Sequence, residues 1–299
     1  MLIVRFRDPV EGHACVGVQN SSGVLREIRA GSLSELLMMP LAQAMRIVES
    51  PLEEVHPPQA LLPPIDGFTE VWASGVTYRR SQQARMEESS VSDVYSKVYE
   101  ADRPELFFKA VAWRVMGDGD MVGVRADSAI NVPEPELALV LNSRGEIFGY
   151  TVCNDMSSRS IEGENPLYLP QAKLFSGSCA LGPGIRPAWT LPAPTRFEIS
   201  VSVSRKDVEV WSATTSTSEM RRTFADLARF LFVGERFPSG AILSTGTGLV
   251  PSLSVSLIEG DTVSIHVTDI GRLTNRVAVG VAPFQGMMPE MICDRISNG

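Results

Sequence analysis

The chain has 299 residues, of which 44% are hydrophobic and 21% are charged, a composition typical of a globular protein and unlike that of a disordered one. The formal net charge of −8, with no polybasic run, argues against a protein that binds nucleic acid or an anionic membrane surface. No segment approaches the length of a membrane span, so we expect no nucleic-acid or membrane partner.

The four cysteines, Cys15, Cys153, Cys179 and Cys293, are widely spaced and form no C-x-x-C pattern. The N-terminal residues MLIVRFRD lack the long apolar stretch of a secretory signal. Disulfides persist mainly in oxidising compartments, so we expect free thiols and a cytoplasmic protein.

Two short strands, LIVRF and ACVGVQ, followed by a helix over residues 33–49, are predicted for the N-terminal part. Ser32 and Glu35 fit the S-x-x-E capping pattern at the start of this helix. Pro40 interrupts the apolar run, which predicts that the helix divides there.

Residues 56–66 are dense in proline and continue neither a helix nor a strand. We therefore place a domain boundary there. The boundary separates a small N-terminal domain, residues 1–66, from a larger domain, residues 67–299.

Strands dominate the rest of the chain. EVWAS and ELFFKAV are typical of strands, and residues 78–89 of a polar helix or an ordered loop. A helix over residues 218–233 interrupts a series of short β runs: RFEISVSVS, VEVWSA, AILST, TVSIHV and NRVAVGV. This pattern predicts a mostly antiparallel roll or sandwich, in which ligands bind in loops at one end of the sheets.

The apolar runs LALVLN and EIFGYTVCN flank the turn signal SRG at residues 143–145, which predicts a hairpin. With a two-residue turn centred on the first two of these residues, Glu134 lies opposite Cys153 and Glu136 lies opposite Thr151. Opposite residues of a hairpin project to the same face of the sheet.

Side chains alternate along a strand, so Glu134, Glu136 and Asp155 project from one face in this register. A slip of one residue would separate Asp155 from the two glutamates. The other face is predicted to hold the apolar side chains of the hairpin, which are Leu137, Leu139, Leu141, Phe148, Tyr150 and Val152.

Three carboxylates on one patch repel each other, and protonation, a basic neighbour or a bound cation relieves that repulsion. Oxygen ligands favour a hard ion such as Mg²⁺ or Mn²⁺, whereas zinc usually recruits His or Cys. The alternative is a solvated strand face on which acidic residues are merely scattered. The spacing leaves both interpretations open, because Glu-x-Glu is common on exposed strands.

Lys173 and the glycine-rich loop LSTGTGLV are further candidate features. Beside a carboxylate-bound dication, Lys173 would accept a proton or hold an anion; otherwise it is a surface lysine. Backbone N–H groups and the hydroxyl around Thr247 can approach a ligand carboxylate, although a tight turn between strands would use the same glycines. The three histidines are isolated, and no G-x-S-x-G supports a serine nucleophile.

The segments PEPELALVL, CNDMSSR and YLPQAK resemble the fumarylacetoacetate hydrolase superfamily, whose hallmark is E-x-E, then Asp in an N-D motif and a later Lys. With PELFFK and TGT, the resemblance covers most of the larger domain, and the first 66 residues look like the smaller N-terminal domain of the same family. It implies an α+β fold that is mainly β, a mixed β-sandwich roll with a small N-terminal α/β domain. It also implies a homodimer or homotetramer with Mg²⁺, or alternatively Mn²⁺, held by Glu134, Glu136 and Asp155.

Within the superfamily, GVTYRRSQQARMEES, YEADRPELFFK and IEGENPLYLPQAK look most like 2-keto-3-deoxy-sugar-acid dehydratases of the arabinonate and xylonate type. The resemblance implies a hydro-lyase of pentose catabolism that converts a C5 2-keto-3-deoxy acid to 2,5-dioxopentanoate through a metal-stabilised enolate. The chain departs from the family twice. Ser81 stands where the hydrolases carry a water-activating histidine, and Ser160 where the family commonly has Asp.

Such a dehydration needs a base near C3 and an acid near the C4 hydroxyl. Our candidates are Lys173 and Glu105, with the two roles unassigned between them. Arg80, Ser81 and Thr247 are candidates for holding the substrate carboxylate or hydroxyls, since charge-assisted bonds from Arg suit that task. For Glu105 and Arg80, surface ion pairs are the alternative interpretation.

Two other functions stay open. The same enolate chemistry would serve an acylpyruvate-type C–C bond hydrolase or an oxaloacetate-type decarboxylase, against which the missing histidine counts. The third possibility is a non-catalytic, metal-stabilised binding protein. In that case Lys173 and the Thr-Gly-Thr loop would have no reason to accompany the carboxylates.

Overall fold

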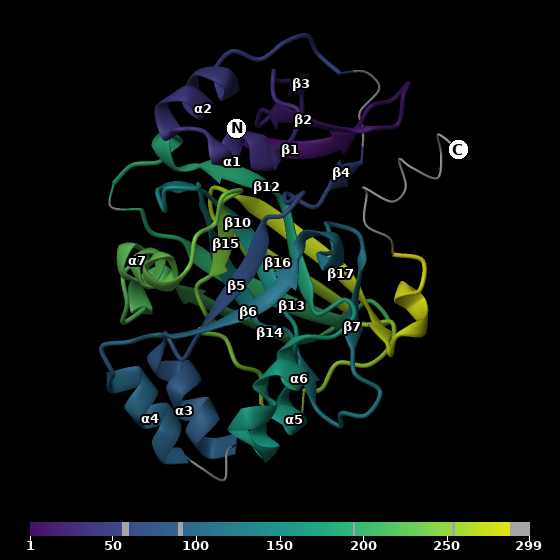
Figure 1. Cartoon of the computed structure of the whole chain (residues 1–299). Coiled ribbons are helices and arrows are strands. Elements are labelled where there is room, and N and C mark those ends of the chain that lie inside the picture. The colour runs from purple at the N-terminus through teal and green to yellow at the C-terminus, as the bar shows by residue number, and fades with distance from the viewer. Residues whose placement is uncertain (56–59, 89–91, 194, 253–254, 288–299) are drawn as a thin grey trace.

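The computed structural model describes residues 1–55, 60–88, 92–193, 195–252 and 255–287. Its centre is a ten-stranded sheet with the order β3-β2-β1-β12-β10-β9-β15-β5-β6, in which β4 also pairs with β1 (Figure 1). The strands of this sheet are β1 Leu2–Arg7, β2 Ala14–Gln19, β3 Leu25–Glu27, β4 Leu61–Leu62, β5 Glu70–Gly75, β6 Glu105–Val111, β9 Pro135–Leu141, β10 Ile147–Asp155, β12 Cys179–Pro187 and β15 Ala241–Ser244.

A five-stranded sheet with the order β14-β13-β16-β17-β7 packs on the large sheet, and a two-stranded sheet joins β11 to β8. Among the described strands, every pair is antiparallel except β15 with β5 and β17 with β7. The predicted α+β fold, mainly β and mostly antiparallel, is confirmed. The strands of the smaller sheets are β7 Met121–Val124, β8 Asn131–Val132, β11 Ser157–Ser158, β13 Glu198–Arg205, β14 Val208–Ser216, β16 Thr262–Val267 and β17 Gly271–Val279.

Helices lie at both ends of the molecule in the view of Figure 1. Helices α1 and α2 lie at the top with the N-terminal strands, whereas α3 to α6 lie at the bottom. The helices are α1 Leu33–Met38, α2 Leu41–Val48, α3 Arg79–Glu88, α4 Ser92–Glu100, α5 Arg159–Glu164, α6 Leu169–Lys173 and α7 Phe224–Gly234.

The N-terminal elements agree with the sequence patterns. β1 and β2 match the two predicted strands, and Pro40 separates α1 from α2 as expected. The Ser32 hydroxyl accepts a hydrogen bond from the Glu35 backbone N–H at 3.0 Å, which caps α1. The capping pattern therefore marks the start of a real helix.

The N-terminal strands continue the large sheet, because β1 pairs with β12 where Ile3 lies opposite Ile185. Side chains of α1 and α2 also share one hydrophobic cluster with the large sheet. The domain boundary at residue 66 stays a prediction, and residues 56–59 of that stretch lie outside the described part of the chain.

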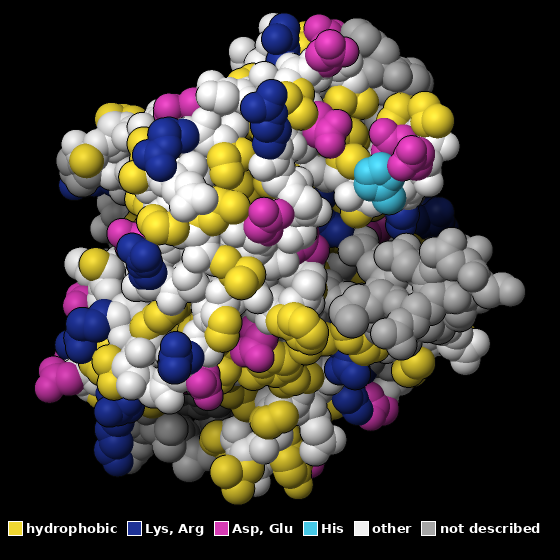
Figure 2. All heavy atoms as spheres, turned by 45° about the horizontal axis from the view of Figure 1, so that its top comes forward, with side chains coloured by type: hydrophobic (Ala, Val, Ile, Leu, Met, Phe, Trp, Pro, Cys, Tyr) yellow, Lys and Arg dark blue, Asp and Glu magenta, His cyan; other side chains and the backbone are white. Residues whose placement is uncertain are grey.

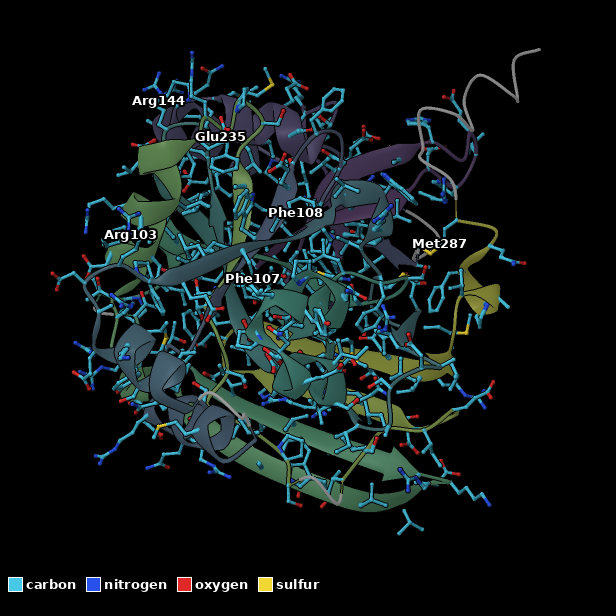
Figure 3. The ribbon with its side chains drawn as sticks, turned by 60° about the horizontal axis from the view of Figure 1, so that its bottom comes forward. Arg103, Phe107, Phe108, Arg144, Glu235 and Met287 are labelled. Atoms are coloured by element: carbon cyan, nitrogen blue, oxygen red, sulfur yellow. The ribbon has the colours of Figure 1, made fainter. Side chains whose placement is uncertain are left out.

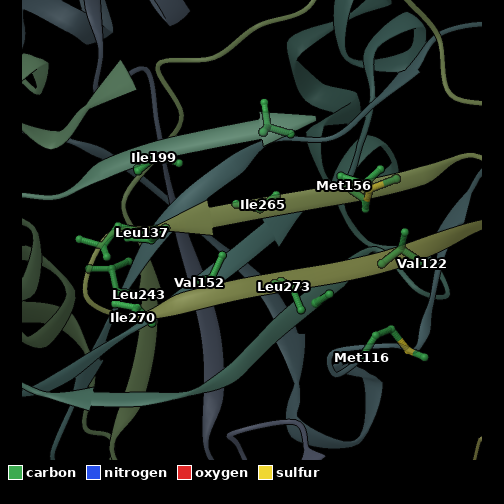
Figure 4. Packing of buried hydrophobic residues seen from close by; sticks show 14 of the residues in the cluster. Met116, Val122, Leu137, Val152, Met156, Ile199, Leu243, Ile265, Ile270 and Leu273 are labelled. Carbon is green, nitrogen blue, oxygen red and sulfur yellow. The ribbon is translucent and has the colours of Figure 1, made fainter. Parts of the chain in front are cut away.

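The large sheet is buried on both faces. Leu137 and Val152 pack with Ile265 of the five-stranded sheet on one side (Figure 4). Ala138 and Val140 pack on the other side in the cluster that includes α1 and α2. All seven residues of β9 are buried, so this strand has no solvated face. Burial on both sides explains why LALVL is a continuous apolar run rather than an alternating one.

The hairpin of β9 and β10 has a different register from the predicted one. Glu136 lies opposite Cys153 and not opposite Thr151. The loop has three residues, 143–145, instead of two, because the pair before it is Asn142 with Glu146. Gly145 makes this loop possible with a φ of +75°, a conformation that residues with a Cβ rarely adopt.

An irregularity in β10 adds a second shift of one residue, between Ile147 and Gly149. The longer loop and this irregularity together move the register by two residues, which returns Asp155 to the face of the glutamates. Phe148 lies within the irregularity and packs in the cluster of the opposite face, so its predicted placement was wrong.

The predicted helix over residues 218–233 begins later. Residues Thr217–Glu219 form a 3₁₀ turn, and α7 starts at Phe224, where the Thr223 hydroxyl accepts a hydrogen bond from the Asp226 N–H at 3.1 Å. A capping threonine sets the start of a helix more strongly than the apolar spacing does. Helix α3 confirms the polar helix after β5, and α4 is a further helix that was not predicted.

Charged side chains of both signs are interspersed on the face shown in Figure 2. No helix in the described ranges has the length and apolar character needed to cross a membrane. Cys15, Cys153 and Cys179 are free thiols, as expected, and Cys293 lies outside the described residues.

We expect Asp66→Ala to lower the free energy of unfolding by about 3–5 kcal/mol, because it breaks a buried ion pair. The two Asp66 oxygens accept hydrogen bonds from the backbone N–H groups of Leu33 and Ser34, each at 2.8 Å, and Arg5 Nε lies 3.3 Å from Oδ2. Urea unfolding measures this loss, and the exposed Glu53→Ala is the control. Equal stability of both variants would contradict a stabilising role for the pair.

Candidate active site

Three buried carboxylates meet at the ends of β9 and β10. Glu134 directly precedes β9, Glu136 lies within it, and Asp155 is the last residue of β10. One oxygen from each side chain lies within 4.8 Å of the others, and the exposed fractions are 3%, 1% and 1%. The structure thus brings together the three carboxylates that the strand alternation put on one face. The alternative of a solvated strand face does not apply, because the face is buried.

Lys173, the last residue of α6, bridges two of these carboxylates. Its ammonium donates hydrogen bonds to Glu134 Oε2 at 2.7 Å, to Asp155 Oδ2 at 3.1 Å and to Ser157 Oγ at 2.6 Å. Three acceptors match the three N–H bonds of an ammonium group. Lys173 is therefore a buried, charged member of the site and not a surface lysine.

Two further cations contact the same carboxylates from other elements. Arg159 of α5 donates from Nη2 to Glu134 Oε1 at 2.8 Å. The Lys109 ammonium of β6 forms an ion pair with Asp155 Oδ1 and donates to the backbone carbonyl of Lys173 at 2.7 Å. Both oxygens of Glu134 and both oxygens of Asp155 are thus in contact with a cation.

Glu136 has different partners. The Ser244 hydroxyl donates to its Oε2 at 2.5 Å and the Gly246 N–H donates to the same oxygen at 2.7 Å. Among the ion pairs of the described residues, none involves Glu136. Burial, followed by the negative charges of Asp155 and Glu134, raises the pKa of the Glu136 carboxyl well above its ordinary value. A cation bound here would relieve the least compensated charge of the site.

The donor set of the cavity suits a divalent ion. Among the described residues, five carboxylates and three cations line or adjoin the cavity. Three of the carboxylates converge with oxygen ligands only, the donor type that Mg²⁺ and Mn²⁺ prefer. The carboxylates are Glu105, Glu134, Glu136, Asp155 and Glu162, and the cations are Lys109, Arg159 and Lys173.

A cavity of about 400 Å³, its open mouth included, lies over the three carboxylates between β5, β6, α5 and α6. Four of the other predicted site residues line it: Glu105, Lys173, Ser81 and Thr247. Arg80 does not belong to the lining and is exposed on α3. The structure therefore brings these residues together with the exception of Arg80.

The predicted substrate hydroxyl donors are bonded to the backbone. Ser81 Oγ donates to the carbonyl of Tyr78 at 2.7 Å. Thr247 Oγ1 donates to the carbonyl of Pro135 at 2.9 Å and accepts a hydrogen bond from the Leu249 N–H at 3.0 Å. These bonds fix the start of α3 and the loop after β15, which both border the cavity, and Thr247 ties that loop to the Glu-x-Glu segment itself.

Glu105 begins β6 and lies opposite Gly75 of β5. A Cβ atom at position 75 would overlap the Glu105 carboxylate, so only glycine leaves this side chain its place at the cavity. Phe107, two residues along the same strand, lies with its ring centroid 5.6 Å from Lys173 Nζ. Figure 3 shows β6 with Phe107 labelled beside the helices α5 and α6.

Sequence reasoning missed four residues of the site, namely Lys109, Arg159, Glu162 and Ser244. A lysine inside the apolar run ELFFKAV is a signal for a buried partner, because lysine is seldom buried unpaired. Arg159 and Glu162 lie on a helix of six residues, too short for a periodic pattern. Arg159 lies in CNDMSSR and Glu162 in IEGEN, so the family resemblance of these segments is the signal that could have found them.

The two departures from the family pattern have structural counterparts. Ser160 Oγ lies 2.7 Å from Ser128 Oγ, and Ser160 is not a lining residue. Neither His13 nor His266 lines the cavity, and His56 lies outside the described residues. Within the described lining, Ser81 occupies the position where the hydrolases of the family carry a water-activating histidine.

Comparison with known proteins agrees with this geometry. The family model for the fumarylacetoacetate (FAA) hydrolase C-terminal region matches residues 70–278. The chain is 50% identical over 214 residues to a probable 2-keto-3-deoxyxylonate dehydratase of Haloferax volcanii, which covers 72% of this chain and 73% of the relative. It is 40% identical over 218 residues to the 2-dehydro-3-deoxy-D-arabinonate dehydratase of Saccharolobus solfataricus, with the same coverage of 72% and 73%.

Solved structures extend the similarity beyond the matched region. A 2-keto-3-deoxy-D-arabinonate dehydratase in complex with magnesium and 2,5-dioxopentanoate has a TM-score of 0.82 and 31% sequence identity. The alignment covers 94% of this chain and 99% of that one. The apo form of such an enzyme has a TM-score of 0.81. The similarity therefore includes the N-terminal strands as well as the sheet that carries the carboxylates.

We expect divalent-cation binding to release protons and to strengthen as the pH rises. A carboxyl with a raised pKa must ionise before it becomes a ligand, so the Mn²⁺ affinity should increase by roughly tenfold per pH unit while Glu136 titrates. Calorimetry in buffers of different ionisation enthalpy measures both quantities. Glu136→Gln should bind more weakly and lose this pH dependence, whereas the exposed Glu49→Gln should behave as the wild type.

The stability of the metal-free protein should fall as the pH rises, opposite to the expected rise in Mn²⁺ affinity. The folded state holds the Glu136 proton more tightly than the unfolded state does, so stability is lost as the pH rises from the ordinary carboxyl range through the raised pKa. Mn²⁺ should reduce that loss, and thermal unfolding with and without the ion measures it. Equal pH dependence in the two conditions would contradict cation binding at Glu136.

Proposed function

Because the chain belongs to the fumarylacetoacetate hydrolase family, we propose that it is a Mg²⁺-dependent dehydratase of 2-keto-3-deoxypentonates, a hydro-lyase of pentose catabolism. It removes water from a C5 acid of the arabinonate or xylonate type and yields 2,5-dioxopentanoate. The two relatives bear the names of such dehydratases, and the similar structure holds magnesium and this product. The observation that carries the proposal is the buried group of Glu134, Glu136 and Asp155 in a cavity whose lining includes further ionisable side chains.

Glu134, Glu136 and Asp155 are the residues that would hold Mg²⁺, with Mn²⁺ as an alternative. When bound, the dication would supply a Lewis acid for the carboxylate and keto oxygens of a 2-oxo acid. Lys173 orients Glu134 and Asp155 through its hydrogen bonds, and Ser244 orients Glu136. The fixed positions of these oxygens spare the site a reorganisation when charge develops on the substrate.

Dehydration breaks the C3–H and C4–O bonds, so one group must take a proton and another must give one. We assign one of these transfers to Glu105, which lines the cavity. Lys173 is the other residue predicted for proton transfer. Its three N–H bonds are directed at three acceptors, so we propose that it acts as an ammonium ion that stabilises negative charge on the substrate.

We also propose that the enzyme works in the cytoplasm as a homodimer or homotetramer. The free thiols of Cys15, Cys153 and Cys179 suit a reducing compartment. Val208 and Val210 on the edge strand β14 are 65% and 42% exposed, an apolar edge that suits contact with a second copy. A monomer mass in light scattering would contradict the assembly.

With Mg²⁺ and the two C4 epimers of 2-keto-3-deoxypentonate, the protein should form an aldehyde from at least one of them. A chelator should abolish the reaction and added Mg²⁺ should restore it, because the carboxylates alone supply no Lewis acid. Coupling to an aldehyde dehydrogenase measures the product. Absence of aldehyde from both epimers would overturn the proposed function.

Gly75→Ala should reduce kcat by about 100-fold, the scale of a displaced acid–base group, because the new methyl group occupies the place of the Glu105 carboxylate. Gly234→Ala is the matched control, since a Cβ atom there meets no other atom within 4 Å. Steady-state kinetics and the melting temperature are compared for both variants. Full activity of both Gly75→Ala and Glu105→Gln would exclude Glu105 as a proton-transfer group.

A further inference from the structure

Glu162 is a carboxylate of the cavity that has no role in the scheme above. It lies on α5, is 4% exposed and lines the same cavity as Glu105. It follows Arg159 by three residues, so the two side chains lie on one face of the helix. Since Arg159 is bonded to Glu134 at 2.8 Å, Glu162 stands one helical turn from the carboxylates at the base of the cavity.

The proposed reaction needs more than one pair of proton transfers. When the C3 proton leaves, the electrons of the C3–H bond form the C3=C4 double bond, and the C4 hydroxyl takes up a proton and leaves as water. The product carries its aldehyde at C5, so a C5 proton and the C5 hydroxyl proton must then leave while protons return to C3 and C4. Atoms and electrons balance with water as the only other product, and no oxidant takes part.

Most ionisable residues of the cavity already have another role in the scheme above. Glu134, Glu136 and Asp155 would serve as metal ligands. Arg159 is bonded to Glu134, and all three N–H bonds of Lys173 are directed at acceptors. The remaining ionisable side chains of the described lining are the carboxyl groups of Glu105 and Glu162.

We propose that Glu162 is a catalytic residue that divides the proton transfers with Glu105. The inference rests on the proposed function. The two carboxyl groups come from different walls, Glu105 from β6 and Glu162 from α5, so a substrate bound at the base of the cavity has one on each wall. Phe107 of β6, labelled in Figure 3, and Leu169 of α6 add apolar surface to the lining, which limits competition from bulk water for the transferred protons.

The test compares Glu162→Gln with the wild type in three measurements: aldehyde formation from 2-keto-3-deoxypentonate, exchange of the C3 hydrogens of 2-oxobutyrate in D₂O, and Mn²⁺ binding. We expect Glu162→Gln to lose at least about 100-fold in aldehyde formation while its Mn²⁺ affinity and melting temperature stay close to those of the wild type. Glu162→Asp should retain an intermediate rate. Of Glu162→Gln and Glu105→Gln, one variant should lose the C3 exchange and thereby identify the C3 base.

Glu164→Gln is the matched control, because Glu164 lies on the same helix and is exposed. It should keep the wild-type rate within about twofold, as expected for a surface site. Glu162→Gln with a rate within threefold of the wild type, or with a loss explained by weaker Mn²⁺ binding, would overturn the inference alone. A wild-type protein that makes no aldehyde would overturn the proposed function, and the inference with it.

Discussion

Repulsion among buried carboxylates is the constraint on which the rest of the structure depends. Oxygens of Glu134, Glu136 and Asp155 lie within 4.8 Å of one another and out of contact with solvent, where each charge needs a partner. The chain supplies those partners from three separate elements: Lys109 from β6, Arg159 from α5 and Lys173 from α6. These ion pairs fix the two short helices α5 and α6, which have little apolar surface of their own. None of the ion pairs among the described residues involves Glu136, where a bound dication would complete the charge compensation.

A sheet with two buried faces makes this arrangement possible. The hydrophobic cluster on one side contains Leu137 and Val152, and the cluster on the other contains Ala138 and Val140. Glu134, Glu136 and Asp155 lie on the same face of the sheet as Ala138 and Val140. They lie beyond the end of the cluster that α1 and α2 cover. The rigid core thereby holds the carboxylates in place from below, while the loop with Thr247 and the helices α5 and α6 close the site from its sides.

The sequence allowed the fold and the grouping of the three carboxylates to be predicted, but only part of the wider site. Alternation along strands placed Glu134, Glu136 and Asp155 on one face, because side-chain parity survives a shift of two residues. The predicted register of the β9–β10 hairpin was wrong, because no residue pattern indicates the irregularity beside Phe148. Contacts between elements distant in sequence, such as that of Arg159 with Glu134, can be identified only in the tertiary structure. For the same reason, the sequence did not show that Arg80 lies outside the described lining of the cavity.

The three-residue loop and the irregularity of β10 compensate for each other. Either feature alone would shift β10 by one residue relative to β9, turning Asp155 toward the opposite hydrophobic cluster and Asn154 toward the glutamates. A single-residue insertion or deletion in this hairpin would therefore separate Asp155 from the glutamates, whereas two compensating changes would keep an odd number of steps along the chain from Glu136 to Asp155.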